Sequence, residues 1–324
     1  MGHGSSPGLV FDEAAPLIAR KQVSADTFEL ALRCPRIAPV ARPGQFVNVM
    51  LPSPDFGYRV RDDAAWHDSG SGGRPFLIRR PFSIYRTYGT HETRGTDEPE
   101  APHDTLVVLV KVVGEGTRQL VGLPVGTGLK VLGPLGNGFR LPPHGATALL
   151  VAGGCGWASL GLLAGELRRR RHPTYAFIGA RTLEELPIET AERRPALAGG
   201  LADACVTATE LEALGVVVGL AAEQGGRVYG GLVTDLLARF LEEKSLAAVR
   251  AYACGPWAML RRVAELCRQH AVPCQVALEE RMACGMGVCN SCVVEVILPD
   301  GSIGHKKLCT DGPVLDAAEV KWEY

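Results

Sequence analysis

The sequence predicts a multi-domain fold: an N-terminal antiparallel β-barrel, a central α/β domain with a parallel sheet, and a small Cys-rich C-terminal domain. Three observations support this. Short β-branched runs separated by glycine and proline fill residues 15–145. Apolar runs alternate with helical patterns over residues 146–280, which is typical of a parallel sheet with helices on both faces. Residues 281–324 contain four of the ten cysteines.

The barrel prediction rests on alternation and on turn signals. Apolar residues alternate with their neighbours over 27–32, and runs with β-branched residues appear at 45–50 and 106–113. Pairs such as Pro43-Gly44 and Gly133-Pro134 separate these runs. Many short strands with frequent turns predict a small antiparallel barrel.

Three stretches of this first half look irregular. Residues 52–75 and 88–104 are rich in Gly, Ser, Asp, Pro and His and lack periodicity, so we expect exposed loop insertions there. Residues 1–14 are expected to form a disordered tail. Their Gly/Ser-rich start has neither the basic nor the apolar region of a secretory signal.

The central part reads as strand–helix alternation. The apolar run 148–152 precedes a glycine turn and a helix that ends at Arg171. Further strands are predicted at 175–179 and 251–254, and a helix at 256–270. This order predicts a parallel sheet, whose carboxyl edge is where ligands bind in α/β folds.

The composition excludes some classes of partner. The chain has 34 basic and 35 acidic residues and a net charge of −1, which indicates no nucleic-acid or membrane-surface partner. The basic run Arg168–Arg171 closes a helical pattern, where cations suit the negative end of the helix dipole. No apolar run approaches the roughly 18–20 residues of a membrane helix. We therefore expect a cytoplasmic protein, whose ten cysteines are metal ligands more often than disulfides.

The C-terminal cysteines follow a C-x4-C-x2-C pattern with a distant fourth cysteine, the spacing of plant-type [2Fe–2S] sites. Two irons need four thiolates on a loop that wraps the cluster, and Gly285 and Gly287 let backbone N–H groups point at the sulfurs. The alternative is structural zinc, which favours two C-x2-C pairs, whereas only one is present. The predicted metal ligands are Cys284, Cys289, Cys292 and Cys309.

Two motifs in the barrel half are compatible with a flavin. In the run 79–83, Arg-Arg-Pro-Phe-Ser, an arginine can bind a phosphate bidentately and a serine hydroxyl can reach a ring edge. In the run 114–117, Gly-Glu-Gly-Thr, a turn into a helix offers free N–H groups to a pyrophosphate. The alternatives are an ordinary Arg-Pro corner and an ordinary helix cap.

Two motifs in the central half are compatible with a nicotinamide. The run 153–156, Gly-Gly-Cys-Gly, lies between a strand and a helix, although it is not the G-x-G-x-x-G fingerprint. The run 254–259, Cys-Gly-Pro-Trp-Ala-Met, ends the last long strand of this part. The alternatives are tight packing at the glycines and a proline in the first helical turn.

Taken in this order with the cysteine set, the motifs resemble those of the ferredoxin-NADP+ reductase superfamily. Within it, the chain looks like the electron-transfer subunits of class 1B dihydroorotate dehydrogenases. The stretches 278–289 and 305–316 carry this likeness, which extends over about residues 15–322. The resemblance implies an FAD-binding barrel domain at 15–145, an NAD-binding domain at 146–280 and a [2Fe–2S] domain at 281–324.

The resemblance also implies which residues hold the cofactors. FAD is expected against Arg80, Pro81, Phe82, Ser83, Leu109, Val110, Lys111, Gly116 and Thr117. NAD is expected over Gly153, Gly154 and Gly156, with Cys254, Gly255 and Pro256 near the nicotinamide. We prefer NAD to NADP because Glu210 follows the third strand, where a carboxylate would favour a free ribose 2′-hydroxyl, and Arg181 is the one basic residue after the second strand. No residue is expected to act as a catalytic acid or base.

The implied partner is an FMN-containing dihydroorotate dehydrogenase catalytic subunit, in a heterotetramer with two of each subunit. Electrons would pass from FMN through the [2Fe–2S] cluster and FAD to NAD+, as a step of pyrimidine biosynthesis. Met282, Met286 and Val288 are candidates for the docking face; the alternative is that they pack in the small domain's core. The competing functions are a related NAD(P)H–ferredoxin oxidoreductase or sulfide dehydrogenase subunit and a non-catalytic zinc-bearing interaction protein.

Overall fold

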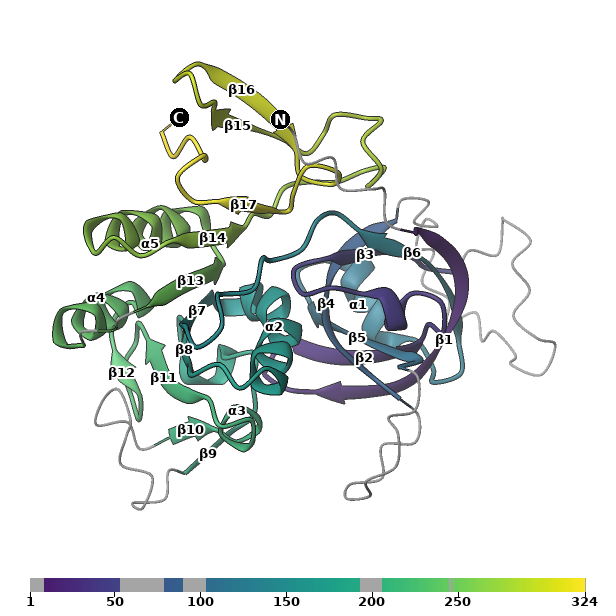
Figure 1. Cartoon of the computed structure of the whole chain (residues 1–324). Helices are drawn as coiled ribbons and strands as arrows, with labels where there is room; N and C mark the ends of the chain where they lie inside the picture. Colours follow the sequence, from purple (N-terminus) through teal and green to yellow (C-terminus); the bar gives the residue numbers. More distant parts are fainter. Residues whose placement is uncertain are drawn as a thin grey trace.

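The computed structural model describes residues 9–52, 79–89, 103–192, 206–244, 246 and 248–323. Figure 1 shows the three parts that the sequence predicts: a barrel, a layered α/β part beside it, and a small segment above both. The fold class is therefore confirmed. Most of the two predicted insertions, over 53–75 and 90–102, lies outside the described residues.

Six antiparallel strands close the barrel in the order β1-β2-β5-β4-β3-β6. Their inward side chains, among them Leu17, Leu30, Val47 and Val108, form one buried core, and the short helix α1 packs Leu120 against it. The elements are β1 (Phe11–Gln22), β2 (Thr27–Arg33), the 3-10 turn η1 (Ala38–Val40), β3 (Phe46–Met50), β4 (Arg80–Tyr88), β5 (Thr105–Lys111), α1 (Glu115–Gly122) and β6 (Gly128–Leu135).

Strand β1 starts at Phe11, inside the stretch 1–14 that the sequence analysis assigned to a tail. Asp12 and Glu13 have little strand propensity, so local pattern does not predict a strand here. Pairing with β6 from Phe11 onward holds the strand in place. The Glu13 carboxylate also accepts the backbone N–H groups of Arg36 and Ile37, at 3.3 and 3.1 Å.

The α/β part is a seven-stranded sheet in the order β12-β11-β8-β7-β13-β14-β17. Its strands are parallel except β17, which runs antiparallel to β14. They are β7 (Thr147–Gly153), β8 (Thr174–Ala180), β11 (Val217–Ala222), β12 (Tyr229–Gly230), β13 (Val249–Cys254), β14 (Cys274–Ala277) and β17 (Val314–Asp316); β9 (Thr190–Glu192) and β10 (Val206–Ala208) form a separate pair.

Helices cover both faces of this sheet because its central strands are apolar on both sides. Along β7, Leu150 packs with α2 on one face, whereas Leu149 and Val151 pack with α4 and α5 on the other. The helices are α2 (Trp157–Arg169), α3 (Thr209–Ala213), α4 (Val233–Glu243) and α5 (Trp257–Gln269), with 3-10 turns η3 (Gly154–Gly156) and η4 (Leu183–Glu185).

Helix α2 lies directly against the barrel. A Cβ atom at Gly161 would lie 2.2 Å from the ring of Tyr85 on β4, so only glycine allows this approach. The indole N–H of Trp157 donates a hydrogen bond to the Tyr85 hydroxyl at 3.3 Å. The two predicted cofactor-binding parts therefore meet along α2 and β4.

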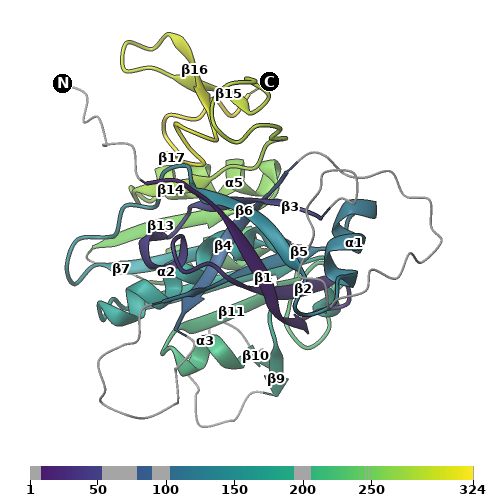
Figure 2. The ribbon, with the colours of Figure 1, turned by 90° about the vertical axis from the view of Figure 1, so that its right-hand side faces the viewer.

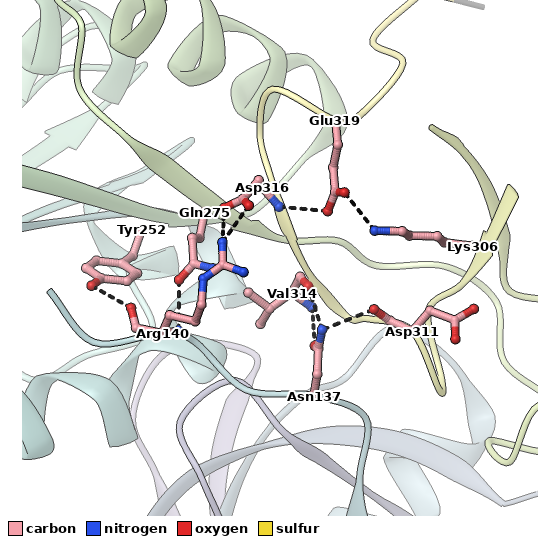
Figure 3. A network of polar contacts seen from close by, with 9 residues as sticks. All are labelled: Asn137, Arg140, Tyr252, Gln275, Lys306, Asp311, Val314, Asp316 and Glu319. Carbon is pink, nitrogen blue, oxygen red and sulfur yellow. Dashed lines mark hydrogen bonds and ion pairs between the residues drawn. The ribbon is translucent and has the colours of Figure 1, made fainter. Parts of the chain in front are cut away.

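The C-terminal segment forms a hairpin of β15 (Val293–Ile297) and β16 (Ile303–Lys307), and then returns to the sheet as β17. Figure 2 shows this hairpin standing above the barrel and the sheet. A network of polar contacts fastens the returning strand to the connection between β6 and β7 (Figure 3). The segment that carries the four cysteines is thus built into both larger parts.

Candidate redox site

The predicted phosphate-binding motifs of the barrel lie in contact. Arg80 begins β4, and its guanidinium covers Gly116 in the first turn of α1. A Cβ at Gly116 would lie 2.2 Å from Arg80 Nη2, so any larger residue here would displace the end of the Arg80 side chain. Burial lowers the pKa of the Arg80 guanidinium, the effect of withdrawing a cation from water. This cation beside a glycine-bearing helix start has the chemistry of a phosphate cradle.

Two neighbours refine this picture. The Thr117 hydroxyl accepts the N–H groups of Val113 and Gly114 at 3.0 and 3.2 Å, so it shapes the turn. Arg79 donates to Asp12 at 2.7 Å through Nη2, whereas its buried Nη1 has no hydrogen-bond partner within the described part of the chain. Arg79, in the same motif as Arg80, could provide a second cation to an anionic ligand through this Nη1.

The other predicted flavin-binding residues differ in how far their side chains are buried. Pro81, Phe82 and Ser83 on β4 are half-buried. Leu109 and Val110 on β5 are buried in two different cores, so only their backbone groups could reach a cofactor. The expectation that these two residues line the site is therefore limited to their main chain.

The glycine turn and the end of β13 are packed together, as neighbouring strands of one sheet. A Cβ at Gly156 would lie 2.2 Å from the Cys254 carbonyl oxygen, and one at Gly153 would lie 2.6 Å from Pro256. At Gly255, φ is +157°, and a Cβ there would be 2.9 Å from the nitrogen of Gly153. Tight packing, the alternative given above, thus explains these glycines. Gly154 is different, because a Cβ there would meet nothing within 4 Å.

Lys111 joins the two halves of the site. Its backbone lies beside the thiol of Cys155 in the glycine turn, and burial raises the pKa of that thiol to about 12. The Lys111 ammonium pairs with Asp26 at 3.2 Å. The end of β5 therefore abuts the strand–helix turn on the carboxyl edge of the sheet.

A chain of four polar side chains crosses the same junction. The Ser83 and Ser159 hydroxyls are 2.8 Å apart, and the Cys254 thiol lies 3.4 Å from Ser159 Oγ and 3.8 Å from Glu279 Oε1. Burial raises the pKa of Cys254 well above its ordinary value and, as the largest cause, raises that of Glu279. The Cys254 thiol therefore stays protonated and is a neutral hydrogen-bonding group.

The sequence analysis assigned roles to Ser83 and Cys254 but missed Ser159 and Glu279. Glu279 follows the end of β14, as Cys254 ends β13, so the carboxyl-edge rule was the signal that could have found it. Ser159 is on the first turn of α2, behind the glycine motif. Ser159 could have been found as a polar residue on a helix face that is otherwise apolar and buried.

The four C-terminal cysteines are arranged as two pairs. The thiol of Cys284 interacts with that of Cys289, and the thiol of Cys292 interacts with that of Cys309. Cys292 and Cys309 are buried and Cys289 is exposed. Within the described residues, no three or more Cys, His, Asp or Glu side chains are close enough to hold one metal ion together. Two thiolates for each iron is the ligand set of a two-iron cluster.

Backbone N–H groups point at these sulfurs. Met286 and Cys289 donate to Cys284 Sγ at 3.5 and 3.4 Å, and Gly287 donates to Cys309 Sγ at 3.1 Å. Gly285 and Gly287 have φ of +72° and +84°, which lets the loop curl around a bound group. The cradle therefore fits a cluster.

The loop also tunes the thiols. The N–H of Met286, followed by that of Cys289, holds the pKa of Cys284 below its ordinary value. The Ser291 hydroxyl is the largest cause that lowers the pKa of Cys289 to about 6. Burial raises the pKa of Cys309 to about 12. The outer pair is thus predisposed to the thiolate form that a metal needs.

Other predicted residues have mixed outcomes. Met286 and Val288 expose 54% and 75% of their surface, whereas Met282 is half-buried against the core. Glu210 pairs with Arg86 of the barrel, so its carboxylate is engaged across the domain boundary and does not support the preference for NAD. Arg181 pairs with Glu185 at 2.8 Å.

Comparison with known proteins identifies the family. Residues 279–321 match the model described as the iron-sulfur cluster binding domain of dihydroorotate dehydrogenase B. The dihydroorotate dehydrogenase B (NAD(+)) electron transfer subunit of Desulforamulus reducens is 32% identical over 97% of this chain and 99% of its own length. The chain belongs to the family of dihydroorotate dehydrogenase B electron transfer subunits. The subunit of Bacillus caldolyticus is also 32% identical, over 96% of this chain and 99% of its own length.

The fold agrees with this family. A solved NADH-dependent reduced ferredoxin-NADP oxidoreductase, known for flavin-based electron bifurcation, superposes with a TM-score of 0.68 at 24% identity, covering 96% of this chain and 90% of its own. The family segment at 279–321 begins at Glu279 and includes all four cysteines and β17. No helix in the described part of this family member is long and apolar enough to cross a membrane.

Proposed function

We propose that the chain is the electron-transfer subunit for a dihydroorotate dehydrogenase catalytic subunit in pyrimidine biosynthesis. The observation that carries this proposal is the cysteine loop whose backbone N–H groups point at the cysteine sulfurs, beside a flavin-type barrel, in a chain that matches this family over 97% of its length. When bound, FAD exchanges hydride with the nicotinamide, and the [2Fe–2S] cluster carries single electrons between FAD and the partner's FMN.

Cys284 and Cys289 would hold one iron, and Cys292 and Cys309 the other. Support comes from the two thiol pairs and from the N–H groups of Met286, Gly287 and Cys289, which would donate to the ligand sulfurs. Such donors stabilise negative charge on the sulfurs and so set the potential. The loop would thus both bind the cluster and tune it.

FAD would lie along the outer face of β4. Arg80, with Arg79 beside it, would pair with its phosphates, and the N–H groups at Gly116 and Thr117 would complete the cradle. Pro81, Phe82 and Ser83 would line the ring, and the main chain of Leu109, Val110 and Lys111 would border its edge.

NAD would enter at the carboxyl edge of the sheet. Gly154, whose Cα faces open space, is the point where a pyrophosphate could approach the turn, between Gly153 and Gly156. Cys254, Gly255 and Pro256 would border the nicotinamide. The protonated Cys254 and the Ser83–Ser159 pair would orient the reacting rings through neutral hydrogen bonds.

The partner would dock over the outer side of the cluster loop. Met286 and Val288 shortly precede Cys289 and are among the most exposed apolar side chains of the described residues. An adaptable apolar surface beside an exposed ligand suits contact with a protein over a short electron-transfer distance. We propose two copies of each subunit in the complex, in the cytoplasm.

Reconstitution tests this function. The purified chain is mixed with a cognate FMN-containing dihydroorotate dehydrogenase subunit, and dihydroorotate-dependent NAD+ reduction is followed. Coupled formation of orotate and NADH is expected. Charged substitutions at Met286 or Val288 should abolish coupling while NADH oxidation by an artificial acceptor continues. A stable complex that never couples the two reactions would overturn the dihydroorotate assignment.

A further inference from the structure

We infer that Asn48 is a positioning residue that holds the cluster loop against the flavin-binding strands and tunes the cluster's exchange of electrons with FAD. The inference rests on the proposed function and adds to it a residue outside the cysteine and flavin motifs. It starts from a buried amide whose oxygen has no hydrogen-bond partner among the residues that the structure describes.

Asn48 lies in the middle of β3, on the outer wall of the barrel. Side chains alternate along a strand, and its neighbours Val47 and Val49 point into the barrel core. In the pairing of β3 with β4, Asn48 lies opposite Pro81, and Val49 lies opposite Arg80. Asn48 is therefore one strand away from the proposed flavin residues, on the side of the barrel that faces the C-terminal segment.

The cluster loop reaches this side chain directly. Asn48 Nδ2 donates to the carbonyl oxygen of Cys284 at 3.4 Å. A Cβ atom at Gly285 would lie 2.0 Å from the same Nδ2, and Gly285 has φ of +72°. Glycine is thus required at this position both for its backbone conformation and for the close approach to Asn48. A ligand cysteine of the cluster is in this way tied to the flavin-bearing wall.

A buried asparagine at position 48 would lower the stability of the fold if its role were structural alone. Asn48 is 1% exposed, its one hydrogen bond is long, and its Oδ1 has no partner in the described structure. An unsatisfied buried acceptor lowers stability, and replacing such a group with an apolar side chain of the same shape is often neutral or stabilising. A leucine would serve packing better, so the amide has a role toward a group that binds here.

The direction in which Asn48 shifts the cluster potential follows from the orientation of its side-chain amide dipole. Asn48 presents its N–H side to the backbone of Cys284, and donors near a cluster favour its reduced, more negative state. Removing the donor should therefore shift the cluster potential to more negative values. It should also free the loop from β3, which slows electron exchange between the cluster and FAD.

The test compares Asn48→Leu with Gln45→Leu in the loaded protein. Gln45 is a matched control, because it immediately precedes the same strand and, among the described residues, its side chain bonds to Gly136 and Arg42 and not to the cluster loop. We would measure the iron, sulfide and FAD content and the thermal unfolding of each variant. We would also measure the EPR spectrum and midpoint potential of the cluster, and the rate of its reduction by NADH after rapid mixing. For Asn48→Leu we expect full loading, equal or greater stability, a more negative potential and slower cluster reduction. Gln45→Leu should leave the potential unchanged.

Stable, loaded Asn48→Leu protein with the parent's EPR spectrum, potential and rate would overturn the inference. If Asn48→Leu fails to fold or to bind its cofactors, Asn48→Asp is measured instead, because aspartate keeps the shape of asparagine and replaces the N–H donor with an acceptor. A cluster potential equal to the parent's in Asn48→Asp would also overturn the inference. Absence of a [2Fe–2S] EPR signal in the parent protein would instead defeat the proposed function.

Discussion

Asn137 and Val314 hydrogen-bond to each other in both directions. Asn137 Nδ2 donates to the Val314 carbonyl at 2.8 Å, and the Val314 N–H donates to Asn137 Oδ1 at 2.9 Å (Figure 3). The same Nδ2 reaches the carbonyl of Asp311 at 3.1 Å. The Asn137 side chain, just after the last barrel strand, thus holds the segment that follows Cys309. The contribution of this contact to stability can be tested.

Asn137→Ala should lower the free energy of unfolding by about 1–2 kcal/mol, because it removes the partners of two carbonyls and one N–H group. Urea unfolding measures this. Arg140→Ala is the matched control: its ion pair with Asp316 joins the same segments, but the two side chains are 64% and 47% exposed. Exposed pairs contribute about 0–1 kcal/mol, so equal losses in the two variants would contradict the assigned role of Asn137.

Cys289→Ser should remove most of the iron and inorganic sulfide while FAD stays bound. Cys289 is the exposed member of the outer thiol pair, and a hydroxyl is a poor substitute for a thiolate ligand. NADH oxidation by an artificial acceptor should persist because it requires only FAD. Iron analysis decides the point, with Cys274→Ala, outside the loop, expected to keep its iron. Full iron in Cys289→Ser would refute the ligand assignment.

Arg80→Ala should weaken FAD binding by roughly 10- to 100-fold, since a charge-assisted hydrogen bond is worth about 1.5–3 kcal/mol. Gly116→Ala should act in the same direction, because the new Cβ would displace the guanidinium. FAD retention after dialysis and its dissociation constant are the measurements. Arg118, whose exposed side chain pairs with Glu115 on the same helix, supplies the control Arg118→Ala. Parent-like FAD binding in both site variants would place the phosphates elsewhere.

The raised pKa of Glu279 predicts a dependence of stability on pH. A carboxyl group whose pKa is raised in the folded state binds its proton more tightly there, so its contribution is present in acid and is lost as pH rises through the folded pKa. Glu279→Gln should therefore unfold like the parent in acid and be more stable than the parent at neutral pH. Thermal unfolding across pH tests this, with Glu280→Gln as the neighbouring control. A stability difference that does not change with pH would contradict it.

Ala271→Gly should stabilise the protein by roughly 0.5–1 kcal/mol. Ala271 follows the C-cap of α5 in the left-handed conformation, with φ of 53°, and the Val272 N–H closes the turn on the Cys267 carbonyl at 2.8 Å. The left-handed conformation costs a residue with a Cβ about 1–2 kcal/mol, which exceeds the entropic cost of glycine. In the control Ala264→Gly, inside α5, glycine should destabilise. Equal melting temperatures for Ala271→Gly and the parent would argue against strain at this cap.

Much of the architecture could be predicted because it depends on local patterns. The alternation at 27–32 and the apolar run at 148–152 specify strands whatever surrounds them, and the cysteine spacing specifies a loop. β17 escaped prediction because three residues carry too little pattern and owe their conformation to pairing with β14. β1 began earlier than expected for the same reason, through its pairing with β6.

The site was harder to predict, because roles there depend on neighbours distant in sequence. Glu210 was interpreted from its position after a strand, but the barrel supplies Arg86 to its carboxylate. Asn48 carries no motif, and its contact with Cys284 spans 236 positions. Ser159 gains meaning only from Ser83 on the opposite domain. Such pairings are properties of the folded chain.

Strand β17 also seals an edge. Its pairing with Gln275, Val276 and Ala277 occupies backbone N–H and C=O groups that would otherwise run open along β14. Open edges recruit strands from other molecules and lead to aggregation. A chain cut at residue 280 is therefore expected to self-associate through β14, even with its barrel and sheet formed. The segment that binds the metal therefore also protects the sheet edge against pairing with strands of neighbouring molecules.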